Sequence, residues 1–290
     1  MDERWGGGVR RPGAGDPYPP VSRAANYVTT GRPCGWHSRG EPDKDEPVAE
    51  GERAVSVPDL LIVIPTLNER ENLAELLEDI RTHAPAAHVL VVDDGSEDGT
   101  EALVREVGAR LGNVEVLQRG RRMGLGSAYQ QGFRIGLERG YRRFVTMDGD
   151  RSHDPRYLPD LLAATESADL VIGSRYMHGI SVVNWGLQRV ILSVVGNEYS
   201  RLVTGLPVRD CTSGFQCFRR EVLEAIDVNR LRFRGYSFLV ELKFRAHRAG
   251  FRLREVPIIF IDRRFGFSKL GVQHLAQSAW AVWAMRFGRR

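Results

Sequence analysis

Short apolar runs alternate with segments of helical spacing along the first part of the globular sequence. Residues 60–64 are continuously apolar and end at Pro65, as expected for a central parallel strand that is buried on both faces. Apolar side chains then recur at helical spacing from Leu73 to Ile80. The predicted elements are strands at residues 60–64, 88–92, 114–117 and 144–147, with helices after Asn68 and at residues 101–111. This alternation predicts an α/β fold with a doubly wound, mostly parallel sheet.

Two of the predicted helices begin with capping signals. Asn68 is a favoured N-cap residue, and Glu71, three residues later, completes a capping box. Thr100 is predicted to cap the helix that follows it, because its hydroxyl can accept a hydrogen bond from the first helical turn.

Polar clusters follow three of the predicted strands, at residues 65–69, 93–96 and 148–150. Ligands of open α/β sheets bind beyond the carboxyl ends of the strands, so three such clusters at one edge indicate a ligand site. Asp148 and Asp150 suit a divalent cation that itself holds a diphosphate. Gly149 between them is expected to let both acids turn toward one point. Taken alone, this stretch is equally consistent with an ordinary turn.

Other nucleotide-binding patterns fit the sequence poorly. It has no G-x-x-x-x-G-K-[ST], and Gly124-Leu125-Gly126 opens a helix without forming the dinucleotide fingerprint or following a strand directly. A nucleotidyltransferase is disfavoured because its usual glycine-rich, basic loop is missing after the first strand. A non-catalytic module that binds membranes or nucleic acid would explain a basic tail but not the three polar clusters.

Eight short motifs follow one another along the chain. They are Pro65-Thr66-Leu67-Asn68-Glu69, Val92-Asp93-Asp94-Gly95-Ser96, Gly124-Leu125-Gly126-Ser127-Ala128, Asp148-Gly149-Asp150, Gly173-Ser174-Arg175-Tyr176, Asp210-Cys211-Thr212-Ser213-Gly214-Phe215, Gly235-Tyr236-Ser237-Phe238, and Asp262-Arg263-Arg264-Phe265-Gly266-Phe267-Ser268-Lys269. The set and its order resemble the family 2 glycosyltransferases, and most of all their dolichyl- or polyprenyl-phosphate mannosyltransferase branch. The resemblance spans about residues 58–270.

The resemblance implies a GT-A, Rossmann-like single domain over residues 58–270 that uses a nucleotide-sugar donor, usually GDP-mannose, with Mg²⁺ or Mn²⁺ and a polyprenyl phosphate acceptor. Matching motif positions imply a nucleoside pocket lined by Pro65, Leu67, Glu69, Val92 and Asp94. They imply a metal and diphosphate site at Asp148, Gly149, Asp150 and Ser152, and phosphate contacts from Arg175, Arg263 and Lys269. The acceptor phosphate is implied at Arg175, Arg189 and Ser193.

The sequence departs from this family at three points. Leu67 stands where the family commonly has Tyr, so stacking on the base is expected to be weaker. Gly149 and Arg151 replace the Ala and Leu of the family's D-A-D-L pattern, which leaves UDP-glucose or another nucleotide-sugar as an alternative donor. Many relatives carry carboxy-terminal membrane helices, whereas this sequence has no apolar run of about 20 residues.

A long helical pattern over residues 183–204 has an informative polar face. Arg189, Ser193 and Asn197 recur every four residues and therefore lie on one side. Apolar side chains flank them, at Val190, Ile191, Val194 and Val195. The stripe fits either a solvated surface or a phosphate clamp on a helix that meets lipid, since a guanidinium binds phosphate oxygens bidentately.

The carboxy-terminal residues 271–290 are predicted to form an amphipathic, basic helix. One side of residues 272–287 carries Val272, Leu275, Ala276, Ala279, Trp280 and Trp283, with Gln273, His274, Gln277 and Ser278 opposite. Arg286, Arg289 and Arg290 close the chain. Such a helix can lie in a bilayer interface, and packing against the domain is an equal alternative.

Charge and composition restrict the partners and the location. Residues 1–57 are rich in Gly, Pro and charge without apolar periodicity, which predicts a disordered arm. Residues 230–290 carry 14 basic and 3 acidic side chains, so this part suits anionic partners such as a diphosphate or a membrane surface. Cys34, Cys211 and Cys217 have neither metal nor disulfide spacing, and no signal peptide is apparent. We expect a cytoplasmic protein, peripheral on the cytosolic face of a membrane, with a possible membrane partner protein and no nucleic acid.

The chemistry expected from these residues is a single in-line displacement with inversion. Asp150, Arg175 and Arg189 are the predicted catalytic residues. A lipid phosphate is already anionic at neutral pH, with a second pKa of about 6, and needs no general base. His153, next to the acidic pair, is therefore expected to position other groups rather than to accept a proton.

Overall fold

The computed structural model describes residues 59–233, 235–262 and 272–288. The chain divides into two units, residues 1–54 and 55–290, and all the described residues belong to the second. The predicted disordered arm, together with Arg263, Lys269, Arg289 and Arg290, lies outside the described residues.

A seven-stranded sheet with the order β3-β2-β1-β4-β7-β5-β8 forms the centre of the fold. Every neighbouring pair is parallel except those of β7, which runs antiparallel to β4 and β5. The strands are β1 (Leu60–Thr66), β2 (His88–Asp93), β3 (Val114–Gln118), β4 (Arg143–Thr146), β5 (Leu170–Ser174), β7 (Gln216–Arg219) and β8 (Leu253–Pro257). Two short strands, β6 (Val182–Val183) and β9 (Phe260–Ile261), pair separately in parallel. The predicted mostly parallel sheet is confirmed.

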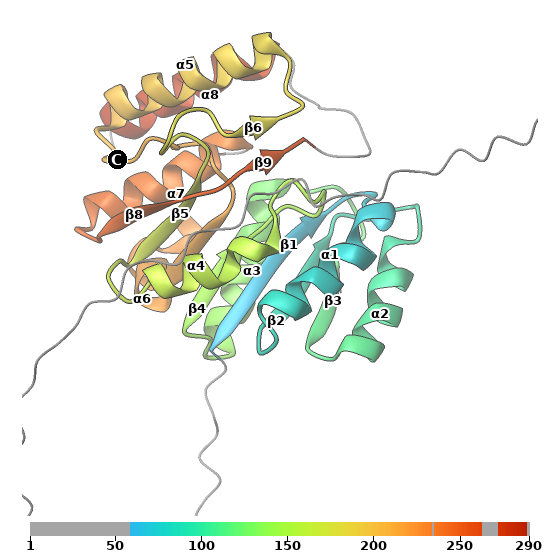
Figure 1. The fold of residues 1–290 in the computed structure, drawn as a ribbon. Coiled ribbons are helices and arrows are strands. Elements are labelled where there is room, and N and C mark those ends of the chain that lie inside the picture. The colour runs from blue at the N-terminus through green and yellow to red at the C-terminus, as the bar shows by residue number, and fades with distance from the viewer. Residues whose placement is uncertain (1–58, 234, 263–271, 289–290) are drawn as a thin grey trace, which may run out of the picture. The chain divides into compact units, whose positions relative to one another are not determined.

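Helices cover both faces of the sheet, which explains why β1 is apolar along most of its length. Leu61 and Val63 pack with α3 (Leu125–Glu138), α6 (Arg220–Ala225) and α7 (Tyr236–Arg248). Leu60, Ile62 and Ile64 pack on the opposite face. The helices on that face are α1 (Arg70–His83), α2 (Thr100–Leu111) and α4 (Leu158–Ala164) (Figure 1). Alternate side chains of a strand point to opposite faces, so both must be apolar here.

Helix α3 lies unusually close to the sheet because of two glycines. A Cβ atom on Gly132 would come 2.4 Å from Val63 Cγ1, and one on Gly136 would come 2.3 Å from Phe144 Cε1. Distances this short cannot be accommodated without moving the helix or the buried side chains of β1 and β4 beneath it.

Helices α5 (Leu187–Thr204) and α8 (Val272–Phe287) lie side by side (Figure 1), and the Tyr199 hydroxyl donates to the Ala279 carbonyl at 3.0 Å. The bounds of α8 match the predicted helix. The helix predicted from residue 183 instead begins at Leu187, because Val183 belongs to β6. The part of the chain that is described contains no helix long and apolar enough to cross a membrane.

Both predicted helix caps are wrong. Asn68 has a φ of 58°, and its side-chain oxygen accepts from the Glu97 backbone N–H rather than from α1. Thr100 is the first residue of α2, and its hydroxyl accepts from the Glu69 backbone N–H at 3.2 Å. The two side chains therefore tie the loops after β1 and β2 together, a tertiary use that competes with local capping.

Candidate active site

The three polar clusters predicted from the sequence meet at the carboxyl edge of β1, β2 and β4. The Asp94 N–H donates to the Thr66 carbonyl at 3.0 Å, and the Asn68 N–H donates to the Ser96 hydroxyl at 2.8 Å. On the other side of β1, a Cβ on Gly149 would come 3.1 Å from Thr66 Cγ2. The sheet order β2-β1-β4 thus places the clusters next to one another, as the rule for open α/β sheets requires.

The acidic pair follows β4 directly. The Asp148 side chain accepts from the Tyr129 hydroxyl at 3.4 Å and is 37% exposed, whereas Asp150 is buried and accepts from the Ser152 N–H at 3.1 Å. The left-handed residue of this turn is Arg151, with a φ of 62°, and not Gly149. Gly149 instead contributes by having no side chain, which leaves space for Thr66 beside it.

Arg151, one of the departures from the family pattern, contacts α1. Its guanidinium lies 3.1 Å from a carboxylate oxygen of Glu75 and 2.9 Å from one of Asp79. These ion pairs tie the loop after β4 to the helix after β1, so Arg151 stabilises the turn that carries the acidic pair.

His153 holds the backbone of the acidic pair. Its Nδ1 accepts from the Asp148 N–H at 3.0 Å, and its ring stacks on Phe215 with 5.1 Å between centroids. Burial lowers the pKa of His153, although the nearby Asp148 and Asp150 act in the opposite direction. A neutral imidazole whose Nδ1 already accepts a backbone hydrogen bond is suited to positioning Asp148, as expected from the sequence.

The acidic pair and Ser152 fit a hard divalent cation. The Ser152 hydroxyl is buried and has no hydrogen-bond partner among the described residues. Over the same ranges, no group of three or more His, Cys, Asp or Glu side chains could hold a metal ion. Two carboxylates and a hydroxyl are oxygen donors of the kind that Mg²⁺ and Mn²⁺ prefer, with the remaining positions left to substrate phosphates and water.

The predicted nucleoside residues lie along β1 and β2. Pro65 and Val92 are register partners, and Leu67 and Glu69 follow β1 in the loop. Asp94 organises the loop before α3, because its carboxylate accepts from the Met123 and Gly124 N–H groups at 3.0 and 2.7 Å and pairs with Arg119 at 2.8 Å. Sequence reasoning missed Arg119, because nothing in the sequence distinguishes it from the nearby Arg121 and Arg122.

Arg175 is held in a buried ion pair. Its backbone N–H, Nε and Nη2 all donate to the Asp210 carboxylate, at 3.0, 2.7 and 2.7 Å, and Nη2 also donates to Thr212. Burial alone would lower the pKa of Arg175, but Asp210 raises it above its ordinary value. Burial alone would likewise raise the pKa of Asp210, and Arg175 holds it below its usual range. Both groups are therefore charged, and the guanidinium has a fixed orientation.

The three predicted acceptor residues come together around Trp185 and Tyr176. The guanidinium carbons of Arg189 and Arg175 lie 4.0 and 5.6 Å from the centre of the Trp185 indole. The Tyr176 hydroxyl donates to Ser193 at 2.8 Å. Arg189 pairs with Asp262 at 2.6 Å. Sequence reasoning missed Trp185 and gave Tyr176 no role beyond its place in a motif, because neither residue belongs to a periodic pattern.

Helix α5 has its polar and apolar sides reversed relative to an ordinary surface helix. Asn197 is buried and accepts from the Thr212 N–H at 3.1 Å, so its side of the helix faces the site and the solvated-stripe alternative is wrong. The opposite side exposes Leu187, Ile191 and Val195, at 75, 54 and 59%. Helix α8 buries Ala281 and Val282 while Trp280 and Trp283 remain exposed. It therefore packs on the domain, yet with its tryptophans outward, and the predicted division of its two sides is only partly right.

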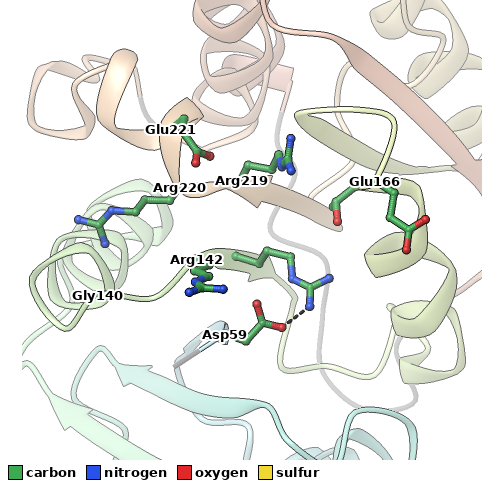
Figure 2. Close-up of a pocket in the computed structure, with 9 residues that line it drawn as sticks. Asp59, Gly140, Arg142, Glu166, Arg219, Arg220 and Glu221 are labelled. Atoms are coloured by element: carbon green, nitrogen blue, oxygen red, sulfur yellow. Dashed lines mark hydrogen bonds and ion pairs between the residues drawn. The ribbon is translucent and has the colours of Figure 1, made fainter. Parts of the chain in front are cut away.

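A cavity of about 550 Å³ lies at the edge of the sheet opposite the candidate site (Figure 2). Arginines and acids line it, including Arg142, Arg219 and Glu166. Arg143 pairs with Asp59 beside it, and Arg220 pairs with Glu224 at 2.7 Å. It lies near the start of β1 and β4, away from the carboxyl ends of these strands, and contains none of the predicted site residues.

Comparison with known proteins decides the family. The sequence pattern described as "Glycosyl transferase family 2" matches residues 61–227, from the first strand to beyond β7. The chain belongs to glycosyl transferase family 2. This glycosyltransferase is 45% identical over 230 residues to the polyprenol monophosphomannose synthase of Mycolicibacterium smegmatis, covering 78% of this chain and 87% of the relative. It is 46% identical over 211 residues to the undecaprenyl-phosphate mannosyltransferase of Micrococcus luteus, covering 73% and 87%.

Solved structures show that the glycosyltransferase has the GT-A fold. Glucosyl-3-phosphoglycerate synthase from Mycobacterium tuberculosis, in complex with Mn²⁺, UDP and glucosyl-3-phosphoglycerate, matches with a TM-score of 0.54 and 20% identity, covering 79% of this chain and 78% of that one. The same enzyme with Mn²⁺, UDP and phosphoglyceric acid gives a TM-score of 0.55 at 22% identity, covering 79% and 77%.

Proposed function

We propose that this glycosyltransferase transfers mannose from GDP-mannose to a polyprenyl monophosphate. The observation that carries the proposal is the reversed helix α5, which brings Arg189 and Ser193 to the site and exposes apolar side chains on its other side. An acceptor with a phosphate head and a long apolar tail needs both surfaces on one element. The names of the relatives from M. smegmatis and M. luteus support the same reaction.

On the donor side, the nucleoside lies against the ends of β1 and β2, at Pro65, Leu67, Glu69, Val92 and Asp94. The diphosphate lies near Asp148, Gly149 and Asp150, with Ser152 completing the oxygen donors for Mg²⁺ or Mn²⁺. When bound, the cation neutralises charge on the departing diphosphate. The resemblance adds Arg263 and Lys269 as further cations for the diphosphate, and both lie outside the described residues.

The residues of this chain align the reactants and hold their charges. An oxygen of the lipid phosphate attacks the anomeric carbon of the sugar, the bond from that carbon to the diphosphate oxygen breaks, and its electron pair leaves with GDP. Arg175 and Arg189 hold the attacking phosphate, with Ser193 as a further donor. Since no proton must be removed, His153 serves to position Asp148. Attack from the side opposite the leaving group inverts the anomeric centre.

The acceptor requires that the enzyme work at a lipid surface. Exposed apolar side chains on α5 and tryptophans on α8 suit the boundary between headgroups and acyl chains, where indole rings are favourable. The basic carboxy-terminal sequence adds attraction to anionic lipids. We propose a peripheral location on the cytosolic face, with a membrane protein as a possible further partner.

The decisive experiment offers the enzyme a panel of labelled nucleotide-sugars, with a polyprenyl phosphate and either Mg²⁺ or Mn²⁺, and extracts the lipid. We expect labelled lipid from GDP-mannose, and we expect the label to disappear when the metal is chelated. Label from UDP-glucose instead would support the alternative donor, which Gly149 and Arg151 leave open as departures from the family pattern. Absence of lipid product from every donor would refute the proposal.

A further inference from the structure

Lys243 is a fully buried lysine on the core side of α7. Its ammonium group donates to the Ser213 carbonyl at 2.8 Å and to the Leu239 carbonyl at 3.3 Å. Burying an ammonium group is costly unless other groups compensate its charge. The proposed reaction uses no group at this position, so its retention needs another explanation.

Lys243 holds residues 210–215, and this segment links the proposed acceptor side of the site to the acidic pair. Asp210, at its start, receives the three hydrogen bonds that orient Arg175. Gly214, near its end, accepts from the Thr146 hydroxyl at 2.6 Å, and a Cβ there would lie 3.3 Å from His153 Cε1 and 3.6 Å from Asp148 Oδ1. The Ser213 carbonyl therefore lies between the ion pair of the acceptor side and the groups that hold the acidic pair.

Lys243 also completes a group of four charges. Asp210 and Glu255 are acidic, Arg175 and Lys243 are basic, and the Glu255 carboxylate accepts from the Asp210 and Arg209 N–H groups at 2.9 Å each. Lys243 interacts electrostatically with the other three, and Arg175 with Asp210. Without the ammonium, Asp210 would no longer share its charge between two cations, and it would draw the Arg175 guanidinium more strongly toward the protein and away from an incoming phosphate.

We propose that Lys243 is a positioning residue for acceptor binding: it fixes residues 210–215 and balances their charge, so that Arg175 can bind the lipid phosphate. The inference rests on the proposed function, because it assigns the role of Arg175 to the acceptor. It concerns neither the donor nor the metal.

A dependence on pH follows from the surroundings of Lys243. Burial lowers the pKa of Lys243 to about 8, while Asp210, Cys211 and Glu255 act to raise it and Arg175 acts to lower it. The ammonium is therefore present at neutral pH and is lost as the pH rises through about 8. Acceptor binding should weaken over the same interval.

The test compares Lys243→Met, which keeps the length of the side chain but not its charge, with the wild type. At pH 7 we expect the KM for polyprenyl phosphate to rise about tenfold, which is the loss expected when one charge-assisted contact is misplaced. The affinity for GDP-mannose, measured by calorimetry, should stay within about twofold. The wild-type KM for the acceptor should rise as the pH is raised from neutral through the pKa of Lys243, and that of the variant should not. Arg248→Met, an exposed change on the same helix, is the matched control.

Three results with the Lys243 variant would each overturn the inference: an unchanged acceptor KM, an equal loss of donor affinity, or the same alkaline rise in variant and wild type. If Lys243→Met unfolds, the double variant with Glu255→Gln restores neutrality, and it should fold and regain part of the acceptor affinity. A wild-type acceptor KM that stays flat through the alkaline range overturns the inference without any variant. If the wild type makes no lipid-linked product at all, the proposed function fails instead.

Discussion

The proposed donor and acceptor halves of the candidate active site are assembled in different ways. On the donor side, the acidic pair and the loops after β1 and β2 come from the ends of neighbouring strands, so the sheet order brings them together and the ion pairs of Arg151 and Asp94 then hold the loops. On the acceptor side, Arg175 pairs with a residue 35 positions away and Arg189 with one 73 positions away. Neighbouring strand ends thus bring the residues of one half together, whereas ion pairs between residues far apart in the sequence orient the arginines of the other. We therefore expect substitutions in the donor half to abolish nearly all transfer activity. Substitutions in the acceptor half should reduce the activity by smaller amounts.

The largest effect is expected from Asp150→Asn, which keeps the size of the side chain and removes one charge from the proposed metal site. Transfer should fall about a thousandfold, as for loss of a major electrostatic contact to a transition state. Metal-dependent donor binding should weaken at the same time. Initial rates and calorimetry with the nucleotide-sugar measure the two quantities. Asp160→Asn, an exposed change on α4, is the control. Normal donor binding in the Asp150 variant would refute the metal assignment.

A smaller and selective effect is expected from Arg189→Ala. Removing one charge-assisted hydrogen bond costs about 1.5–3 kcal/mol, which corresponds to a loss of roughly ten- to a hundredfold in kcat/KM for the lipid phosphate. Donor binding should be near normal, because Arg189 contacts Trp185 and Asp262 rather than the acidic pair. Arg201→Ala on the same helix, whose partner Glu198 is a surface residue, should change neither quantity. Equal loss of donor affinity would mean that the two halves are not separate.

Membrane attachment should respond more weakly to any single change. The double variant Leu187→Ser and Ile191→Ser loses apolar area from the outer side of α5. Its binding to anionic vesicles should fall roughly three- to tenfold. Turnover on a short-chain acceptor in detergent should persist. The wild type should be released from membranes by high salt or alkaline carbonate, since salt at 0.1 M screens charges beyond about 10 Å. Retention through both washes would indicate a further anchor.

The smallest effect is expected at the amino terminus. A chain that starts near Val57 lacks only the segment without apolar periodicity, so its fold and its turnover should stay within about twofold of the full chain. Circular dichroism and initial rates measure both. If the truncated enzyme folded but were inactive, the amino-terminal arm would be required for turnover, contrary to this prediction.

The same division explains what the sequence could predict. A strand end is a local feature: an apolar run, a terminator and a polar cluster suffice, so β1, β2 and β4 and their acids could be read directly. The caps at Asn68 and Thr100 could not, because their side chains bond across two loops. The roles of Trp185 and Lys243 could not be predicted either, because they depend on partners that only tertiary packing brings into contact. The reversal of α5 was visible as a polar stripe, but only its contacts with Thr212 and Asp262 revealed which side is buried.

The close seating of α3 has a consequence for the mutations that this enzyme can tolerate. Gly132 and Gly136 weaken the helix by about 1 kcal/mol each relative to alanine, yet alanine cannot replace them without displacing α3 or the buried side chains beneath it. The same helix carries Tyr129, whose hydroxyl reaches Asp148. A methyl group added at Gly132 or Gly136, one or two turns after Tyr129, would thus disturb the acidic pair by tilting the whole helix. Chance variation at these two glycines should therefore impair catalysis while leaving every substrate contact chemically intact.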